Sequence, residues 1–265
     1  MDTKLTQMEI QGLSLLDERF RTGTPSWIKS NINDDDAPFL AGLVVNTYPT
    51  HILEIGVASG FSSAVMLEAA NSCPGFTRLS AVDISPSYFV NLDIPTGQAV
   101  LEMTPEHLHQ YNLITGCQAF EAMDQIGKVD LVFIDANHFH PFTTIDMLSV
   151  LPFIKQGSWV ALHDISMCLT DTDTHANRGP YYLYNLWPGP RIHSSFHPSG
   201  IGAIHLDCKP EYYLDYLLEI LYTPWECDID QETLSKIVRF VGRHFGDEWA
   251  GRYEKMFKVS TDRFK

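Results

Sequence analysis

Two aspartates stand where they could hold a cation or share a proton. Asp135 directly follows an apolar run at residues 129–134, and Asp164 comes two residues after a second apolar run at residues 158–162. We expect these runs to be neighbouring parallel strands, about 5 Å apart in the hydrogen-bonding direction. Both carboxylates would then lie at the carboxyl edge of the sheet, where open α/β sheets bind ligands. Carboxylates that converge in this way repel each other unless a cation or a proton lies between them.

A histidine near Asp135 could complete this chemistry. A hard cation such as Mg²⁺ prefers oxygen ligands, and it could lower the pKa of a substrate hydroxyl bound beside it. His138 stands three residues after Asp135 and could take up the hydroxyl proton as a general base, because imidazole titrates near neutral pH. Two plainer interpretations stay open: Asp135 could cap a helix, and His138 could be a hydrogen-bonded loop residue. The pattern therefore predicts the activation of a hydroxyl group.

A glycine-rich turn between a strand and a helix is the second candidate for a binding site. Residues 51–62 read HILEIGVASGFS, an apolar strand followed by Gly56, Gly60 and a helical segment. Glycines let a ligand approach the backbone, and the N–H groups at the helix start suit a carboxylate or a phosphate. The next strand ends at Asp83, where an acid in a doubly wound sheet faces ribose hydroxyls. These features predict a nucleoside site, although a turn without a ligand and an Asp83 that only caps the turn at Ser85 stay open.

Alternating strand and helix patterns would position these residues. Apolar runs without polar alternation indicate buried parallel strands that are covered by helices on both faces. Such runs occur at residues 51–55, 79–82, 112–115, 129–134 and 158–162. Residues 191–196 and 204–206 indicate a hairpin that closes the sheet. Further helices are expected near both termini, at residues 5–20, 212–221 and 234–245; the sequence leaves open whether they cover the site or form a homo-oligomer.

Two polar segments are assigned to the surface rather than to a metal site. Asp34, Asp35 and Asp36 precede an apolar run at residues 37–45, and acids in that place cap a helix start on a solvated face. The acids and histidine of residues 171–175 lie in a turn-rich stretch, which is typical of a solvated loop.

Composition narrows the classes of partner. The chain has 265 residues and a formal net charge of -15, and such a field repels phosphate backbones and anionic lipid. We therefore expect a small-molecule acceptor, with no nucleic acid and no membrane as a partner. The five cysteines are scattered without a CxxC pair, which favours reduced thiols in a cytoplasmic protein. Neither a signal peptide nor an apolar stretch long enough to span a membrane is expected.

The glycine-rich turn resembles a known cofactor motif. Glu54-x-Gly56-xxx-Gly60 is similar to the ExGxxxG motif of class I S-adenosylmethionine-dependent methyltransferases, and it is spaced differently from the GxGxxG of dinucleotide binders. The resemblance implies that Gly56, Ser59 and Gly60 line the methionine end, that Glu54 lies beneath the loop near the cofactor amine, and that Asp83 binds the ribose. It also implies that adenine meets one of residues 117–119, of which we choose Gln118.

Residues 129–165 resemble a subgroup of this family, the family 24-like enzymes that include macrolide-sugar O-methyltransferases. The match extends over roughly residues 52–206. It implies a doubly wound, seven-stranded, mostly parallel Rossmann-like sheet of order 3-2-1-4-5-7-6, with extra N- and C-terminal helices. We accordingly divide the chain into an N-terminal helical extension at residues 1–36, a cofactor-binding core at residues 37–208 and a C-terminal helical extension at residues 209–265.

The same resemblance assigns roles at the predicted edge of the sheet. Asp135 and Asp164 match metal-ligand positions of the metal-dependent members, and His138 matches their catalytic base. The chain departs from that pattern at His163, where a third acid is usual, and at Asn137, where an acid is frequent. Because magnesium prefers oxygen, His163 as a ligand would favour a softer ion such as Mn²⁺, Fe²⁺ or Zn²⁺ over Mg²⁺. A hydrogen-bonding role for His163 beside the ligands stays open.

These assignments predict an S-adenosylmethionine-dependent enzyme that methylates a hydroxyl of a small acceptor, such as a sugar or a natural product. One alternative is an NAD-dependent oxidoreductase on a similar sheet, but the chain lacks GxGxxG, and Tyr184 is followed four residues later by Pro188 instead of lysine. The other alternative is a non-catalytic module that binds S-adenosylmethionine.

Overall fold

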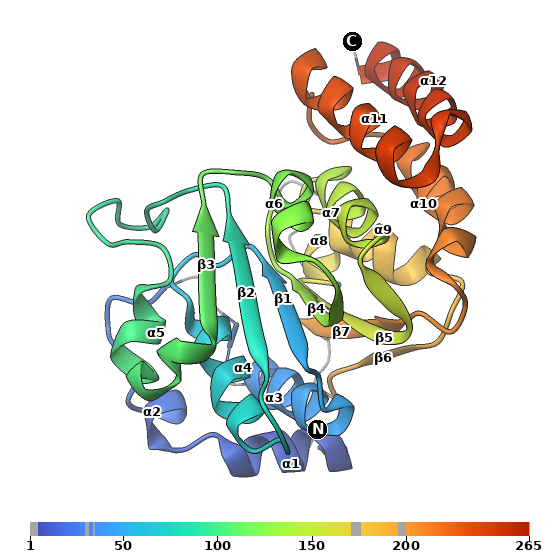
Figure 1. The fold of residues 1–265 in the computed structure, drawn as a ribbon. Coiled ribbons are helices and arrows are strands. Elements are labelled where there is room, and N and C mark those ends of the chain that lie inside the picture. The colour runs from blue at the N-terminus through green and yellow to red at the C-terminus, as the bar shows by residue number, and fades with distance from the viewer. Residues whose placement is uncertain (1–4, 30–31, 34, 171–175, 196–199, 265) are drawn as a thin grey trace.

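A computed structural model describes residues 5–29, 32–33, 35–170, 176–195 and 200–264. The polar run at residues 171–175 and the acid Asp34 lie outside these residues. The described chain forms one seven-stranded sheet of order β3-β2-β1-β4-β5-β7-β6, which confirms the predicted order (Figure 1). The strands are β1 (His51–Ile55), β2 (Arg78–Asp83), β3 (Tyr111–Thr115), β4 (Val129–Ile134), β5 (Ile154–His163), β6 (Arg191–His193) and β7 (Ile201–His205).

The central strands are parallel and the hairpin is antiparallel. Strands β1 to β5 pair in parallel, whereas β7 runs antiparallel to β5 and β6 antiparallel to β7. All five residues of β1 are buried, as expected for an apolar strand that is covered on both faces. Strand β5 begins four residues earlier than predicted, because Ile154 still pairs with Val129 before a register shift that contains Gly157 with φ 89°.

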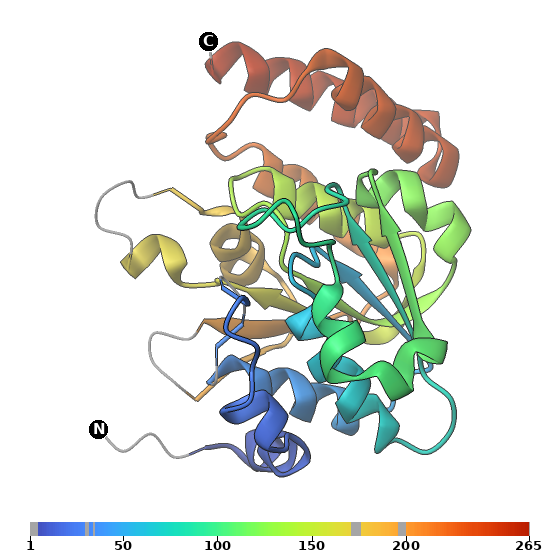
Figure 2. The same ribbon diagram turned by 90° about the vertical axis from the view of Figure 1, so that its left-hand side faces the viewer.

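One face of the sheet carries the N-terminal half of the helices. These elements are α1 (Gln7–Leu15), α2 (Glu18–Arg21), α3 (Asp36–Thr47), α4 (Phe61–Asn71), α5 (Gln98–Met103) and the 3-10 helix η1 (Pro105–Gln110). Their apolar side chains form one core with the sheet, in which Phe20, Phe39 and Phe61 are almost completely buried. Figure 2 shows these helices gathered along one side of the strands. The predicted helix start before residue 37 is confirmed.

The opposite face carries the C-terminal helices. They are α6 (Ala119–Ile126), α7 (Phe142–Val150), α9 (Gly179–Leu186), α10 (Leu214–Leu221), α11 (Gln231–Phe245) and α12 (Asp247–Phe264), with two short elements at α8 (Met167–Thr170) and η2 (Pro210–Tyr213). Phe240 of α11 and Tyr253 of α12 belong to the same core as Val132 of β4. Figure 1 shows α11 and α12 as a helical pair beyond α10, on the side toward which β1, β2 and β3 point. The proposed division into a core and two extensions stays a prediction.

None of the described helices combines the length and the apolar composition that a membrane-spanning helix needs.

Candidate functional site

Two glycines shape the turn after β1. Gly56 has φ 88°, and a Cβ atom there would lie 2.2 Å from the carbonyl oxygen of Asp135. Gly60 has φ 86°, and its Cβ would lie 2.7 Å from Cα of Gly97. Both positions need glycine, since the left-handed backbone and the short distances exclude a side chain. These glycines therefore let the turn pack against the loops at residues 135–136 and at Gly97, and they also let a ligand approach the backbone.

The carboxylate of Asp83 holds the same turn in place. Its Oδ2 accepts hydrogen bonds from the backbone N–H of Val57 at 2.9 Å and of Ala58 at 3.0 Å. Its Oδ1 accepts one from the N–H of Ser85 at 2.8 Å, so the cap that the sequence left open is present. A carboxylate has about four acceptor sites, and the remaining one is available to a ligand.

Glu54 lies beneath the turn. Its side chain is fully buried, and the hydroxyls of Ser62 and Ser63 at the start of α4 donate hydrogen bonds to it. Burial raises the pKa of Glu54 to about 8; the two serines oppose that rise, and the nearby charges of Asp135 and Asp83 add to it. A buried, neutral carboxyl group that joins strand to helix is a structural element of the turn.

A cavity of about 420 Å³ opens beside the turn. The predicted binding residues that line it are Gly56, Asp83, Gln118 and Asp135. Glu54, Ser59 and Gly60 lie behind this wall; the backbone oxygen of Ser59, for example, accepts the N–H of Ala99 at 2.8 Å.

The sequence analysis did not predict the residues that form the far wall of the cavity. Phe142 and Asp146 of α7 and Asp228, Ile229, Asp230 and Thr233 around the start of α11 complete the lining. The last four residues lie beyond the segment that resembles the methyltransferase family, and no motif marks them. Among the described residues that line the cavity, five are aspartates and none is lysine, arginine or histidine.

The predicted metal and base residues meet at one end of this cavity. Oδ1 of Asp135 lies 3.1 Å from Nε2 of His138 and 3.1 Å from Nδ1 of His163. Oδ2 of Asp164 lies 3.5 Å from Nδ1 of each histidine. Each of the four residues offers one atom that lies within 4.8 Å of the others. Their proximity follows from the adjacent carboxyl ends of β4 and β5, as the sequence predicted.

A fifth residue, Asp36, contacts this cluster and corrects an expectation. Asp36 is 1% exposed, and its Oδ2 lies 3.3 Å from Nε2 of His163. The assignment of this acid to a solvated helix face is therefore wrong, although α3 does begin there. The helix start is instead held by Asn33, whose Oδ1 accepts the N–H groups of Asp35 and Asp36. Asp36 and His163 lie 127 positions apart in the chain, which explains why no local pattern linked them.

The charges of the cluster perturb one another. Burial acts to raise the pKa of Asp135, but the charges and hydrogen bonds of His163 and His138 outweigh it and hold that pKa below its usual range. Burial acts to lower the pKa of His138 and of His163, and Asp135 with the other carboxylates raises both, that of His163 by far the more. The pKa of Asp164 is raised by burial against the opposing charges of the two histidines.

The C-terminal segment holds the loop that carries His138. Oε2 of Glu226 accepts hydrogen bonds from the backbone N–H of His140 at 2.6 Å and of Arg178 at 2.9 Å. The carbonyl oxygen of His138 accepts the N–H of Gly179 at 2.8 Å. One carboxylate therefore fixes the segment after β4 against the segment before α9.

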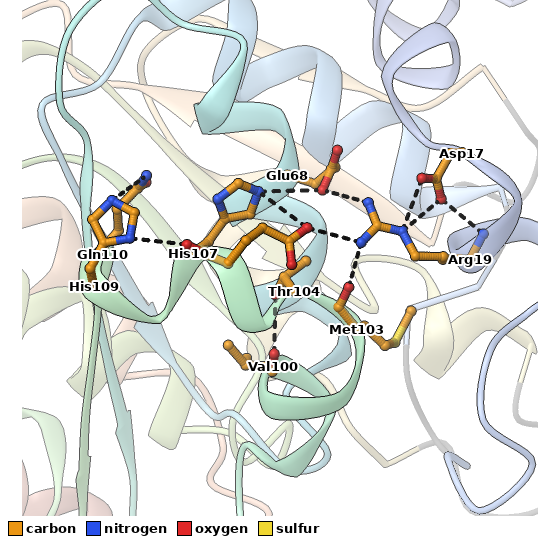
Figure 3. Close-up of polar contacts among 10 residues, drawn as sticks. Asp17, Arg19, Glu68, Val100, Met103, Thr104, His107, His109 and Gln110 are labelled. Carbon is orange, nitrogen blue, oxygen red and sulfur yellow. Dashed lines mark hydrogen bonds and ion pairs between the residues drawn. The ribbon is translucent and has the colours of Figure 1, made fainter.

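A second group of acids and a histidine shows how such a cluster is satisfied without a ligand. Glu68, Glu106 and His107 lie close together (Figure 3). The guanidinium of Arg19 lies 3.1 Å from Glu68 and 3.0 Å from Glu106, and it also pairs with Asp17. This group is an ion-pair network that ties α2 to α4 and η1. In the described part of the chain, no such arginine or lysine pairs with the cluster around Asp135.

The donor set around Asp135 suits a divalent cation. Its two carboxylates and the imidazole of His163 form a mixture that favours Mn²⁺, Fe²⁺ or Zn²⁺ over Mg²⁺. In His163 one ring nitrogen faces Asp36 and the other faces Asp135 and Asp164. Metal-binding histidines commonly donate their second N–H to a carboxylate in this way, which orients the ring. Asp135, His163 and Asp164, with His138 beside them, would hold the ion.

Known proteins resemble this chain in sequence and in structure. Residues 53–165 match the family model described as a methyltransferase domain. A putative O-methyltransferase from Klebsiella pneumoniae is 17% identical, with a TM-score of 0.53 over 77% of this chain and 91% of that chain. The O-methyltransferase from Bacillus cereus in complex with SAH is 16% identical, with a TM-score of 0.50 over 77% of this chain and 93% of that chain.

A third structural relative extends the same picture. The O-methyltransferase TomG from Streptomyces achromogenes, involved in tomaymycin synthesis and solved in complex with SAM, is 17% identical, with a TM-score of 0.51 over 77% of this chain and 92% of that chain. At such identities the likeness shows the fold. Among curated proteins, none matches this sequence.

Proposed function

We propose that this chain, whose residues 53–165 match a methyltransferase domain and whose sheet has the order found here, is an S-adenosylmethionine-dependent enzyme that methylates a hydroxyl group of a small acceptor. The observation that carries the proposal is the position of Asp135. This residue lines the cavity beside the glycine-rich turn and also belongs to the cluster with His138, His163 and Asp164. A cofactor in the cavity would therefore end where a base and a candidate metal site begin.

The charge of the cavity favours this cofactor over a dinucleotide. S-adenosylmethionine carries a sulfonium and an ammonium group, and five aspartates on the wall attract such a ligand. The diphosphate of NAD would be repelled by the same wall, because no lysine, arginine or histidine is among the described lining residues. This argument adds to the missing GxGxxG against the oxidoreductase alternative.

The chemistry would use His138, which contacts Asp135 of the cavity wall. S-adenosylmethionine, when bound, supplies a methyl group on a positively charged sulfur. His138 would donate its Nε2–H to Asp135 and accept the proton of the acceptor hydroxyl at Nδ1, and Asp135 and Asp164 would stabilise the resulting imidazolium at the distances given above. A divalent ion at the cluster would supply Lewis acidity that lowers the pKa of the hydroxyl. Positioning of the acceptor oxygen in line with the methyl group would account for most of the acceleration.

The acceptor class rests on the activities for which the structural relatives are named. The three relatives described above are O-methyltransferases by name, and one of them takes part in the synthesis of a natural product. These descriptions support oxygen as the methyl acceptor and a sugar or another hydroxylated natural product as its carrier. The His138–Asp135 pair supports an enzyme over a non-catalytic binding module, because a binder has no use for an oriented base.

Binding and turnover test the proposal in two steps. Calorimetry with S-adenosylmethionine, S-adenosylhomocysteine and NAD should detect the two sulfur compounds and not NAD, and binding of neither would refute the cofactor. A screen of hydroxylated acceptors should then detect methyl transfer that falls by about 100-fold or more in His138→Ala. The control is His109→Ala, at an exposed histidine of η1. Full turnover in His138→Ala would remove the base.

The metal is tested separately. The protein is treated with EDTA and assayed again after addition of Mn²⁺, Fe²⁺, Zn²⁺ or Mg²⁺. We expect loss of turnover on chelation, recovery with one of the first three ions, and no recovery in Asp164→Asn. Turnover that survives thorough chelation would exclude the metal and leave the cofactor and the base in place.

A further inference from the structure

The base at His138 stands on the loop at residues 135–141, which joins β4 to α7. Asp135 and Asp164 contact its ring, whereas its backbone is held by a segment from elsewhere in the chain. The carbonyl oxygen of His138 accepts the N–H of Gly179 at 2.8 Å. A general base has to lie within hydrogen-bond reach of the proton that it removes, so the path of this loop decides whether the base can act.

His140, two residues after the base, anchors this loop to the C-terminal part of the chain. Its side chain is completely buried. Its N–H donates to Oε2 of Glu226 at 2.6 Å, and its carbonyl oxygen accepts the N–H of Glu226 at 2.9 Å. The hydroxyl of Thr223 lies 2.9 Å from Nε2 of the His140 ring. The segment between α10 and α11 therefore binds both backbone polar groups and the ring of one loop residue.

The same carboxylate oxygen of Glu226 reaches a third segment. Oε2 also accepts the N–H of Arg178 at 2.9 Å. Arg178 directly precedes Gly179, which donates to the carbonyl oxygen of His138. These hydrogen bonds close a ring through the loop of the base, the start of α9 and the C-terminal segment. The side chain of Glu226 is only 9% exposed, so little water is present to replace this acceptor if it is removed.

We propose that Glu226 is a positioning residue, which fixes the path of the loop and so holds His138 where it reaches the acceptor hydroxyl. The inference rests on the proposed function. Glu226 acts as a hydrogen-bond acceptor, since both N–H groups donate to one of its oxygens. Displacement of a reacting group by about 1 Å can cost about 100-fold in rate. Glu226 lies outside residues 53–165, which match the methyltransferase domain, so the C-terminal segment contributes to turnover.

Three replacements of Glu226 separate the roles of acceptor, charge and reach. Glu226→Ala removes the acceptor, so kcat should fall by about 10- to 100-fold, while the KM for S-adenosylmethionine and the affinity for S-adenosylhomocysteine stay those of the unaltered protein. Glu226→Gln keeps an oxygen with two lone pairs, which suffices for both N–H groups, so kcat should be retained. Glu226→Asp keeps the charge but is one methylene shorter, so kcat should fall as in Glu226→Ala.

A double-mutant cycle tests whether Glu226 acts through the base. In His138→Ala the base is already absent, so adding Glu226→Ala should lower turnover by less than about threefold further. A further fall as large as that caused by Glu226→Ala alone would show that Glu226 acts on another group, and it would overturn the inference.

Asp130→Ala is the matched control. Asp130 stands near the start of β4, at the opposite edge of the sheet, and its carboxylate accepts the N–H groups of Thr50 at 3.2 Å and of His51 at 2.9 Å. Loss of this acceptor should lower the urea midpoint of unfolding, as Glu226→Ala does, and leave kcat unchanged. An equal fall of kcat in Asp130→Ala would assign the effect to general destabilisation and overturn the inference.

The remaining outcomes distinguish this inference from the proposed function. Full turnover in Glu226→Ala and Glu226→Asp, with turnover lost in His138→Ala, would overturn the inference and leave the proposed function intact. A kcat as low in Glu226→Gln as in Glu226→Ala would overturn the role of Glu226 as an acceptor. Full turnover in His138→Ala, or failure of the unaltered protein to bind S-adenosylmethionine and S-adenosylhomocysteine, would overturn the proposed function and the inference with it.

Discussion

Replacement of Glu54 by glutamine should make the folded protein less sensitive to rising pH. Glu54 is completely buried beneath the glycine-rich turn, and burial raises its pKa from 4.5 to about 8. In Glu54→Gln the side chain keeps almost the same volume and can still hydrogen-bond the hydroxyls of Ser62 and Ser63. The substitution therefore removes the titration and leaves the packing.

The sign and size of the effect follow from the two pKa values. Below about pH 4.5 the carboxyl is protonated in the folded and in the unfolded chain, so its full contribution to stability is present. As the pH rises toward about 8, only the unfolded chain releases the proton, and each pH unit lowers the free energy of unfolding by about 1.4 kcal/mol. Above the folded pKa the loss is complete, at about 5 kcal/mol in total.

Urea unfolding at several pH values measures this loss. The difference in free energy of unfolding between Glu54→Gln and the unaltered protein should increase by about 3 kcal/mol in favour of the variant between about pH 5.5 and about pH 7.5. This difference should stop increasing above about pH 8.5. Glu219→Gln, on the exposed side of α10, is the control and should show a gap that does not change with pH. Parallel pH profiles for Glu54→Gln and the unaltered protein would refute the reasoning that the folded state buries a neutral carboxyl there.

Three further substitutions test other contacts of the site. Gly56→Ala should lower the free energy of unfolding by at least about 1 kcal/mol and abolish binding of S-adenosylhomocysteine, because its Cβ would lie 2.2 Å from the carbonyl oxygen of Asp135; a stable variant that binds the ligand would contradict this packing. Asp36→Asn should weaken Mn²⁺ binding by about 10- to 100-fold, measured by calorimetry, because Asp36 orients His163; equal affinity would show that the contact does not support a ligand. Glu226→Ala should cost about 1 to 3 kcal/mol in urea unfolding, since two partly buried backbone N–H groups beside the base lose their acceptor; a loss below about 0.5 kcal/mol would argue against that role.

The elements that carry the site could be predicted because local patterns encode them. The apolar runs of β1, β2, β4 and β5 and the glycines of the turn mark a parallel sheet and its first loop directly in the sequence. The convergence of Asp135, His138 and Asp164 follows from one rule of topology, since neighbouring parallel strands end at the same edge. The ends of strands were predicted less accurately. The start of β5 is an example, because the register shift that extends it depends on its partner strand β4.

Other parts of the site depend on contacts that no local pattern contains. Glu54 and Ser59 belong to the recognised motif, yet the structure places them behind the cavity wall, because the turn packs against the loops at residues 95–97 and 135–136. Asp146 has ordinary helical surroundings in the sequence, and its exposure to the cavity depends on how α7 packs.

The sequence by itself therefore determined the parallel strands, the glycine-rich turn and the convergence of Asp135, His138 and Asp164, since each is written in strand ends and glycine positions, whereas the order of the sheet and the place of His163 came from the resemblance to the family. Only the tertiary structure decided that Asp36 from the start of α3 orients His163, and that the segment around Ile229 closes the far end of the cavity. The physical reason is that hydrophobic periodicity specifies an element and the face it buries. Contacts between segments distant in the chain depend instead on how whole elements pack, and packing is a property of the assembled core.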